Sequence, residues 1–339
     1  MKRNPFFDNA RILLIFLVVF GHMIQPFVDG SRGMNTLYMW IYTFHMPAFI
    51  LLAGFFAKGL GNKDYIINLA KKLIMPYIIF QLLYTGYYFL IGKADWQASL
   101  FYPQWALWFL ISLFSWHMLL YWFKKIPAGL SVMIAVQIGL IVGYFGEIGH
   151  TFSLSRTFVF FPFFLVGYFI TERQIMQVKQ KGIKIASVLV MVTLAVAIYY
   201  LPAIDTGWLL GSSSYAELGL PAYGGIARLG VYVVATLMVI SIMSWVPKSK
   251  TRLTHIGSRT LYVYLLHGFF IQYFREADVF EINNALDVVG LGIISAVLVL
   301  VLSSKPLLGI TQPLMEGKAT IMKNAYSGKT SKESAQTKA

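Results

Sequence analysis

The stretch FFDNARILLIFLVVFGHM, residues 6–23, decides the fold class and points to the chemistry. Its centre, residues 12–20, is apolar without interruption, which is typical of a helix that spans a membrane. An ionisable side chain inside such a helix is costly unless it has a partner or a task, so His22 needs an explanation. At about 100° per residue, Arg11 and His22 lie on one helix face about 16 Å apart, and Asp8 shares that face.

The composition places the whole chain in a membrane. Hydrophobic residues make up 58% of the 339 positions and charged residues only 12%, far below the charged share of a soluble domain. The net charge of +14 falls in short loops between apolar runs, where membrane orientation and anionic lipid explain it, so we expect no nucleic-acid partner. Because the chain has no cysteine, a thiolate nucleophile, a Cys-ligated metal and a disulfide framework are excluded.

Ten apolar segments recur along the chain, and their lengths suit helices that cross a hydrocarbon core about 30 Å thick. The sequence therefore predicts an all-α integral membrane protein with about ten transmembrane helices. We expect one membrane domain over residues 1–314 and a basic, disordered cytoplasmic tail over residues 315–339. The predicted segments are 12–28, 37–57, 73–92, 105–123, 130–146, 156–171, 184–201, 224–245, 258–274 and 286–304.

Loop charge orients the predicted bundle, since Lys and Arg concentrate in cytoplasmic loops. The side that holds both termini carries 23 of the 28 basic residues, so we predict that both termini are cytoplasmic. We expect a multi-pass protein of the cell membrane, with a bacterial cytoplasmic membrane as its lipid bilayer. The longest outer loop, residues 202–223, is interpreted either as a lid or acceptor platform or as a flexible connector. The opposite side has five basic residues, which are Arg32, Lys93, Arg156, Arg228 and Arg275.

Four histidines lie inside predicted helices, at His22, His45, His117 and His267. A neutral imidazole in a shared cavity is well suited to take a proton from a hydroxyl near neutral pH, which predicts general-base chemistry. The alternative is a structural histidine that is hydrogen-bonded between helices. Their spacing gives no i, i+4 pair and their helices hold no nearby carboxylate, so we expect no metal.

Arg11 and Asp8 mark the predicted cytoplasmic end of the first helix. An ion pair at i, i+3 near a helix start is also what helix stability alone favours. The functional interpretation is that Arg11 holds an anionic part of a cytosolic cofactor, as fixed cations do for phosphate groups. Both interpretations stay open at this point.

Six motifs, from the segment Phe7 to His22 in the first apolar run to SRTLYVYLLHGFF (258–270) near the end, resemble those of the membrane-bound acyltransferase 3 family. The family's first helix carries an Arg, ten intervening residues and a His, and this chain has that spacing from Arg11 to His22, with Asp8 where the family commonly has an acidic residue. The chain departs from the family's Arg-x-x-Arg entry to the third helix, because it has Lys71 and Lys72 there, which weakens a phosphate-binding role for that segment. The other matching motifs are FHMPAFILLAGFF (44–56), KKLIMPYIIF (71–80), WALWFLISLF (105–114), FFPFFLVGYFI (160–170) and SRTLYVYLLHGFF (258–270).

The resemblance is greatest to the short branch of the family, which is similar to fucose 4-O-acetylase-like and polysaccharide-adhesin acyltransferases. It implies that the protein is an O-acetyltransferase. Acetyl-CoA would be the donor and a hydroxyl of a cell-surface or lipid-linked carbohydrate the acceptor, as in polysaccharide modification. His22 would serve as general base or acyl relay, and Arg11, assisted by Asp8, would orient the CoA. His45, His267 and His117 would relay protons or position the thioester.

Basic and aromatic residues toward the predicted outer side are further expected contacts. Arg156 and Arg228 could meet the acceptor or donor, or anchor the protein at the interface. The tryptophans could stack on sugar rings or form an interfacial belt. The rival class is an exporter or transporter of a polysaccharide or lipid-linked sugar, since buried ionisable groups in a helical bundle also suit translocation. The tryptophans in question are Trp96, Trp105, Trp108 and Trp208.

Overall fold

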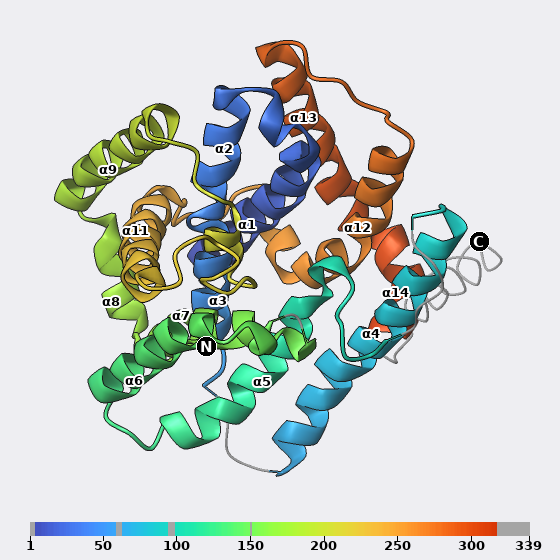
Figure 1. The fold of residues 1–339 in the computed structure, drawn as a ribbon. Helices are drawn as coiled ribbons and strands as arrows, with labels where there is room; N and C mark the ends of the chain where they lie inside the picture. The colour runs from blue at the N-terminus through green and yellow to red at the C-terminus, as the bar shows by residue number, and fades with distance from the viewer. Residues whose placement is uncertain (1–3, 59–62, 94–98, 150, 317–339) are drawn as a thin grey trace.

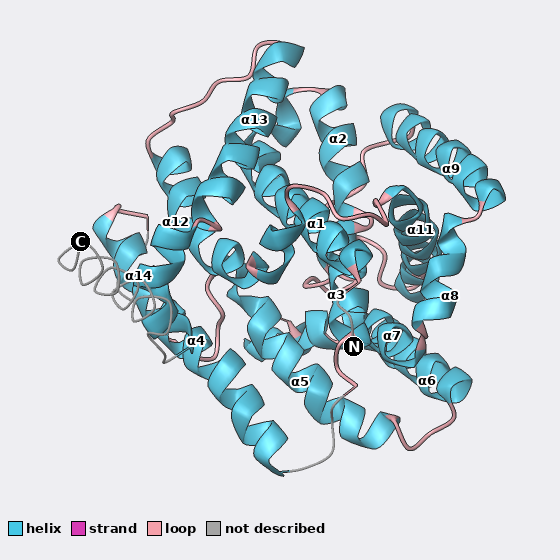
Figure 2. Cartoon of the chain, turned by 180° about the vertical axis from the view of Figure 1, so that it is seen from behind, coloured by secondary structure: helices cyan, strands magenta, loops and turns pink. Residues whose placement is uncertain are grey.

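The computed structural model describes residues 4–58, 63–93, 99–149 and 151–316, and this part of the chain is helical without a strand (Figures 1 and 2). The longer helices are α1 (Pro5–Ile24), α2 (Arg32–Tyr42), α3 (His45–Phe55), α4 (Lys63–Leu90), α5 (Trp108–Phe123), α6 (Ala128–Ile141), α7 (Leu154–Phe169), α9 (Lys181–Tyr200), α11 (Gly224–Trp245), α12 (Thr260–Glu276), α13 (Ala285–Leu302) and α14 (Lys305–Glu316). Short elements include α8 (Glu172–Met176), α10 (Gly207–Leu210), η1 (Gln25–Gly30), η2 (Trp105–Leu107), η6 (Gln177–Lys179) and η7 (Thr254–Ser258).

The prediction of an all-α integral membrane protein is confirmed. Each predicted apolar segment falls on a helix or on two consecutive helices. Among the described residues, eight helical stretches are long and apolar enough to cross a membrane, and the two other predicted spans are the shorter α6 and α12. α14 was not predicted, and it takes in the first two residues of the expected tail; residues 317–339 of that tail lie outside the described residues. The cytoplasmic location of the termini stays a prediction.

α1 begins earlier than its predicted boundary. Pro5 occupies the first turn, where its missing N–H is not needed, and the Asn4 side chain accepts a hydrogen bond of 3.0 Å from the amide of Phe6. This cap extends the helix over a stretch that the apolar pattern does not mark. Asp8 and Arg11 therefore lie within the helix and not in the segment that precedes it.

The predicted segment 37–57 is two helices. The backbone of Phe44 leaves the helical region, with φ −132° and ψ −25°, and α2 ends just before it. Pro47 is tolerated in the first turn of a new helix, where its ring does not displace a helical hydrogen bond. Because of the break, His45 is the first residue of α3. The ring of Tyr42 contacts the rings of both His45 and His22.

α1 lies in the middle of the bundle, and α9, α6 and α4 lie at its periphery (Figures 1 and 2). The helices that pack on α1 include α13, α12, α3 and α2. Half of the apolar stretch of α1 is buried, compared with 6% of that of α9. Most side chains of α1 in that stretch therefore contact protein far more than those of α9 do.

α3 and α7 cross in backbone contact. A Cβ at Gly54 would lie 2.0 Å from the carbonyl oxygen of Phe164, and one at Gly167 would lie 1.9 Å from that of Leu51. Only glycine fits at either position. The crossing fixes α3, which carries His45, against α7.

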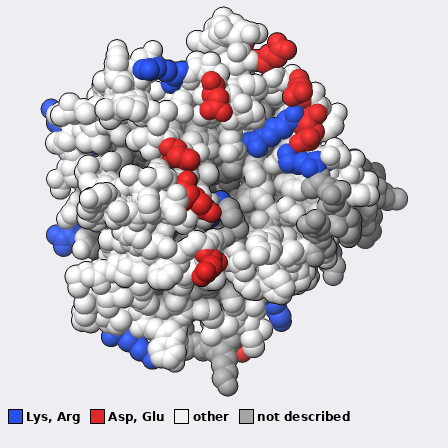
Figure 3. Space-filling model, in the orientation of Figure 1, with Lys and Arg blue, Asp and Glu red and all other residues white. Residues whose placement is uncertain are grey.

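One face of the molecule is acidic and hollowed. Figure 3 shows several Asp and Glu side chains spread over this face, a hollow near its middle, and Lys and Arg mainly toward its edges.

Candidate active site

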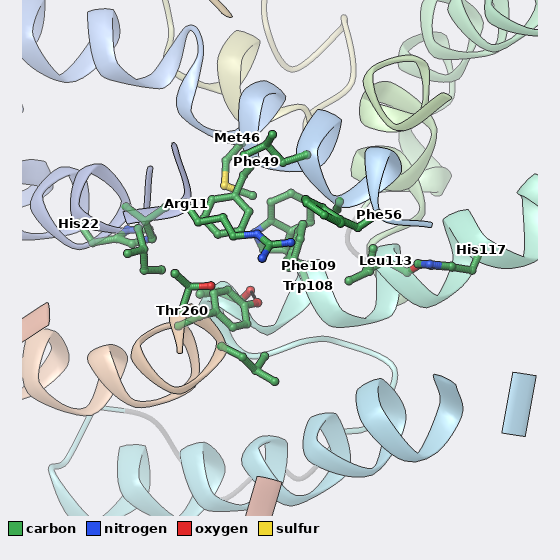
Figure 4. Close-up of a pocket in the computed structure, with 17 residues that line it drawn as sticks. Arg11, His22, Met46, Phe49, Phe56, Trp108, Phe109, Leu113, His117 and Thr260 are labelled. Carbon is green, nitrogen blue, oxygen red and sulfur yellow. Dashed lines mark hydrogen bonds between the residues drawn. The ribbon is translucent and has the colours of Figure 1, made fainter. Parts of the chain in front are cut away.

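A cavity of about 320 Å³ runs along α1 (Figure 4). From α1 it is lined by Arg11, Ile15, Val18 and His22, whose spacing of three and four residues places them on one helix face. The other walls come from α3, η2, α5 and the first two turns of α12, and most of their side chains are apolar. The cavity therefore joins the cation at the start of α1 to the imidazole near its end.

Arg11 is held in place on two sides. Its guanidinium lies 3.6 Å from the carboxylate of Asp8 and 4.2 Å from the centre of the Phe56 ring. Asp8 is almost fully buried, whereas a quarter of the Arg11 side chain stays exposed. This arrangement presents a fixed positive charge to the cavity, as recognition of an anionic group requires.

Asn9 ties the start of α1 to the segment that follows α11. Its amide donates hydrogen bonds of 2.9 Å to the carbonyl oxygens of Pro247 and Ser249, and its own oxygen accepts one of 2.7 Å from the Thr254 hydroxyl. A Cβ at Gly257 would lie 2.5 Å from the α1 backbone, so η7 packs directly on the helix. The position of Arg11 thus depends on contacts from a distant part of the chain.

His22 is surrounded by aromatic rings. The ring centre of Trp105 lies 4.4 Å from that of His22, and the ring centre of His267 lies 5.6 Å away. The Tyr42 hydroxyl lies 3.4 Å from His22 Nδ1 and forms a hydrogen bond with it. These three neighbours come from η2, α12 and α2, so the tertiary fold brings them to α1.

Arg275 secures the backbone at His22. Its guanidinium donates to the carbonyl oxygen of His22 and, at 2.9 Å, to the side-chain oxygen of Gln25. Its carbon centre also lies 5.8 Å from the Trp105 ring. This arginine closes the end of α1 where the helix leaves its last carbonyl groups without intrahelical partners.

The histidines differ in what faces their Nδ1 atoms. A carbonyl oxygen only accepts, so a histidine whose Nδ1 faces one carries hydrogen on Nδ1 and leaves Nε2 as the acceptor. The Tyr42 hydroxyl can donate or accept, so His22 can hold its proton on either nitrogen and keep this hydrogen bond. The carbonyl contacts are 3.0 Å from His45 to Ile41, 2.7 Å from His117 to Leu113 and 2.7 Å from His267 to Tyr264.

A second cavity, of about 130 Å³, meets the first one at His22. Leu209 and Leu210 of the predicted outer loop line it, which assigns part of that loop to a cavity wall. Both cavities include the side chains of His22, Met46, Ala106 and Trp108, and the second also includes Gln25, Tyr42, His45, Trp105 and Arg156. His22 therefore stands at the junction of two chambers.

Arg156 and Arg228 have different surroundings. Arg156 lines the second cavity, lies 5.1 Å from the Trp108 ring centre and donates to the Leu210 carbonyl oxygen at 3.3 Å. Arg228 is 2% exposed, donates to the carbonyl oxygen of Trp208 and lines neither cavity. The structure therefore places Arg156 at the site, whereas Arg228 holds the loop at α10.

The remaining predicted residues also fall into those that line a cavity and those that do not. His45 and Trp105 line the second cavity, and Trp108 lines both. His267 has no exposed surface, and its Nε2 has no hydrogen-bond partner among the described residues. His117 lies in the first cavity at the far end from His22, beyond Arg11 (Figure 4). Trp208 stacks on Tyr215, and Trp96 lies outside the described residues.

The sequence reasoning missed how Trp105 is placed. Its backbone has φ +41°, a conformation that residues with a side chain rarely adopt. The Gln81 side chain fixes the segment before it, donating to the carbonyl oxygens of Ser99 and Tyr102 at 2.7 and 2.8 Å. A Cβ at Gly268 would lie 2.5 Å from the Trp105 ring, so that glycine makes room for it. No local pattern in the sequence indicates these contacts.

The fold and the site define a class of protein: a multi-pass helical membrane protein in which a histidine separates two chambers. Within residues 4–58, 63–93, 99–149 and 151–316, no group of three or more His, Asp or Glu side chains is arranged to hold a metal ion.

The sequence profile of the acyltransferase 3 family, described as an acyltransferase domain, matches residues 4–304, and the chain belongs to this family. No curated protein and no solved structure matches the chain significantly. The match includes α1 and every other element that lines the two cavities. Family membership therefore supports transferase activity, and the matched residues include the whole candidate site.

Proposed function

We propose that this acyltransferase moves an acetyl group from acetyl-CoA to a hydroxyl of a cell-surface or lipid-linked carbohydrate. The observation that carries the proposal is that His22 lines both cavities. A donor bound beside Arg11 and an acceptor bound beside Arg156 would meet at the His22 ring. Holding two reactants at one catalytic group supplies much of the advantage of an enzyme over a reaction in solution.

The first cavity suits the donor. Coenzyme A carries phosphate groups, and Arg11 offers them a cation whose orientation Asp8 and Phe56 restrict. The apolar wall between Arg11 and His22 suits the uncharged arm that ends in the thioester. His117, beyond Arg11, adds a polar group at the far end of this chamber. With Arg11 at the cytoplasmic side, the donor arrives from the cytosol of a bacterial cell.

His22 has two chemical routes. In direct transfer it takes the proton of the acceptor hydroxyl as that oxygen bonds to the acyl carbon, the C–S bond breaks, and the thiolate of CoA receives the proton. In the covalent route a His22 nitrogen first bonds to the acyl carbon with release of CoA, and the acceptor hydroxyl then displaces the imidazole. The Tyr42 hydroxyl can donate to an unprotonated Nδ1 or accept from a protonated one, so it can keep its hydrogen bond to His22 in both routes.

The second cavity suits the carbohydrate. Trp105 and Trp108 provide aromatic faces for a sugar ring, and Arg156 provides a donor for hydroxyl or acidic groups. His45 lines the same chamber, and with hydrogen on Nδ1 its Nε2 can accept a hydrogen bond from a second hydroxyl of the sugar. His267 lies behind the His22 and Trp105 rings and positions them.

The test uses the full chain in liposomes with radiolabelled acetyl-CoA and a cell-surface glycan preparation. We expect label on the glycan with the wild type and none above background with His22→Ala. Arg156→Ala should reduce labelling of the glycan, and Lys125→Gln, at an exposed position outside both cavities, should leave it unchanged.

Two results would contradict the proposal. One is full acetyl transfer by a folded His22→Ala variant, which removes His22 from the chemistry. The other is movement of labelled glycan across the sealed vesicle without any acyl donor, which would support an exporter in place of an enzyme.

A further inference from the structure

A groove of about 330 Å³ lies between α1 and α13, apart from the two cavities of the candidate active site. The helices lie side by side in both views (Figures 1 and 2). α1 lines the groove with Asn9, Ile12, Leu13 and Phe16, a different face of the helix from the one that bears Arg11 and His22, and α13 lines it with Ala296, Val299 and Leu300.

The groove opens to the surroundings of the bundle. Leu300 and Leu253, both on its wall, are 45% and 46% exposed. Both α1 and α13 are long and apolar enough to cross a membrane, so the groove lies beside hydrocarbon. An open apolar groove in that position gains dispersion contacts when a hydrocarbon chain fills it.

One end of the groove is basic. Pro247, Thr251 and Leu253 line this end, and the basic residues between them are Lys248, Lys250 and Arg252, all exposed. No Asp or Glu occurs from residue 218 to residue 275, so this segment has no acidic residue of its own to balance the three cations. Asn9, the one polar side chain that α1 contributes, is already engaged by the same segment.

We infer that this groove binds an anionic phospholipid, with an acyl chain between α1 and α13 and the phosphate on Lys248, Lys250 and Arg252. The combination of an apolar groove along two spanning helices and a cationic loop at its end matches the two parts of such a molecule. A bound lipid would also hold the loop that Asn9 ties to α1, and with it the start of the helix that carries Arg11. The inference does not depend on the proposed enzymatic activity.

The test measures lipid retention by native mass spectrometry of the full chain released from detergent. Dioleoylphosphatidylglycerol, with one negative charge, is compared with zwitterionic dioleoylphosphatidylcholine, and glycerol 3-phosphate tests whether a phosphate without acyl chains suffices. We expect phosphatidylglycerol to be retained in preference to both. Neutralising the cations in Lys248→Gln/Lys250→Gln/Arg252→Gln should weaken that binding by roughly 100-fold, since each basic residue near an anionic lipid surface contributes a measurable share.

Two further variants make the result specific to the groove. Ala296→Phe fills the groove and leaves the cations in place, so it should also weaken phosphatidylglycerol binding. Lys124→Gln/Lys125→Gln/Lys181→Gln removes three cations elsewhere and should retain the lipid as the wild type does. The inference is overturned by equal retention of the two phospholipids, by no retention of either, by unchanged binding in the loop variant, or by equal loss in the Lys124 control variant.

Discussion

α1 and α9 are both helices of 20 residues with almost the same hydropathy, yet the molecule uses them in opposite ways. α1 lies at the centre and places Arg11 and His22 in a cavity, whereas α9 lies at the edge with 6% of its apolar stretch buried. α1 has one basic residue in its first two turns, Arg11, and α9 has two, Lys181 and Lys184; both helices have polar residues further along. The difference teaches that hydropathy identifies a spanning helix but that the partners of its polar residues determine its role.

The largest difference between the two helices is expected when a basic residue near the start of each is replaced. Arg11→Ala should lower kcat/KM for acetyl-CoA by about 10- to 100-fold, because hydrogen bonds between charged groups contribute about 1.5–3 kcal/mol. Lys184, in the first turn of α9, lies 5.6 Å from the Trp245 ring centre, and Lys184→Ala should leave kcat/KM unchanged. Steady-state kinetics at varied acetyl-CoA measures both, and equal losses in the two variants would refute the distinction.

Removal of a buried, hydrogen-bonded side chain should lower the stability of the protein more on α1 than on α9. Asn9→Ala leaves two carbonyl groups and the Thr254 hydroxyl without their partner, so we expect the free energy of unfolding to fall by about 1–3 kcal/mol. Ser187 on α9 accepts hydrogen bonds from Trp245 and Ser244, and Ser187→Ala should cost about 1 kcal/mol or less. Reversible unfolding in mixed micelles compares the variants, and a larger loss for Ser187→Ala would reverse the ranking.

A smaller effect is expected at the hydroxyl that faces His22. Tyr42→Phe keeps the ring and removes one hydrogen bond, so kcat should fall by roughly 2- to 10-fold. Tyr200, at the end of α9, is 73% exposed, and Tyr200→Phe should not change kcat. An unchanged kcat in Tyr42→Phe would show that this hydroxyl has no part in orienting His22.

The smallest effect concerns Lys179, which precedes α9 and donates to the Ser244 and Val246 carbonyl oxygens. Burial, together with the nearby Lys184 and Lys248, lowers the pKa of Lys179 from 10.5 to about 8. The unfolded chain therefore binds more protons than the folded chain between these values, and stability contributed by this group rises with pH across that window. Below the lower value the cost of the buried charge is present in full.

Thermal unfolding between about pH 7.5 and 9.5 measures this contribution. The midpoint of the wild type should rise with pH relative to that of Lys179→Gln, which cannot titrate at this position. Parallel pH profiles of the two proteins would show that Lys179 has the same pKa in the folded and unfolded chains.

Local patterns in the sequence were sufficient for most of the apolar spans and for one face of the site, but not for α14 or for the break between α2 and α3. The apolar runs mark where the spans lie, and the spacing from Arg11 to His22 places both on one face of α1. The contact of Arg275 with His22 joins residues 253 positions apart, so no helical period indicates it. The positive φ of Trp105 and the structural role of Arg228 likewise arise from tertiary packing, to which an apolar sequence offers few clues.

The crossing of α3 and α7 has a mechanical consequence. With no side chain between the backbones at Gly54 and Gly167, the two helices cannot slide past each other without collision and must move as one rigid body. His45 and Met46 on α3 and Arg156 on α7 belong to that body. Any opening that admits a ligand would therefore involve the other elements that line the cavities, among them η2 and α12.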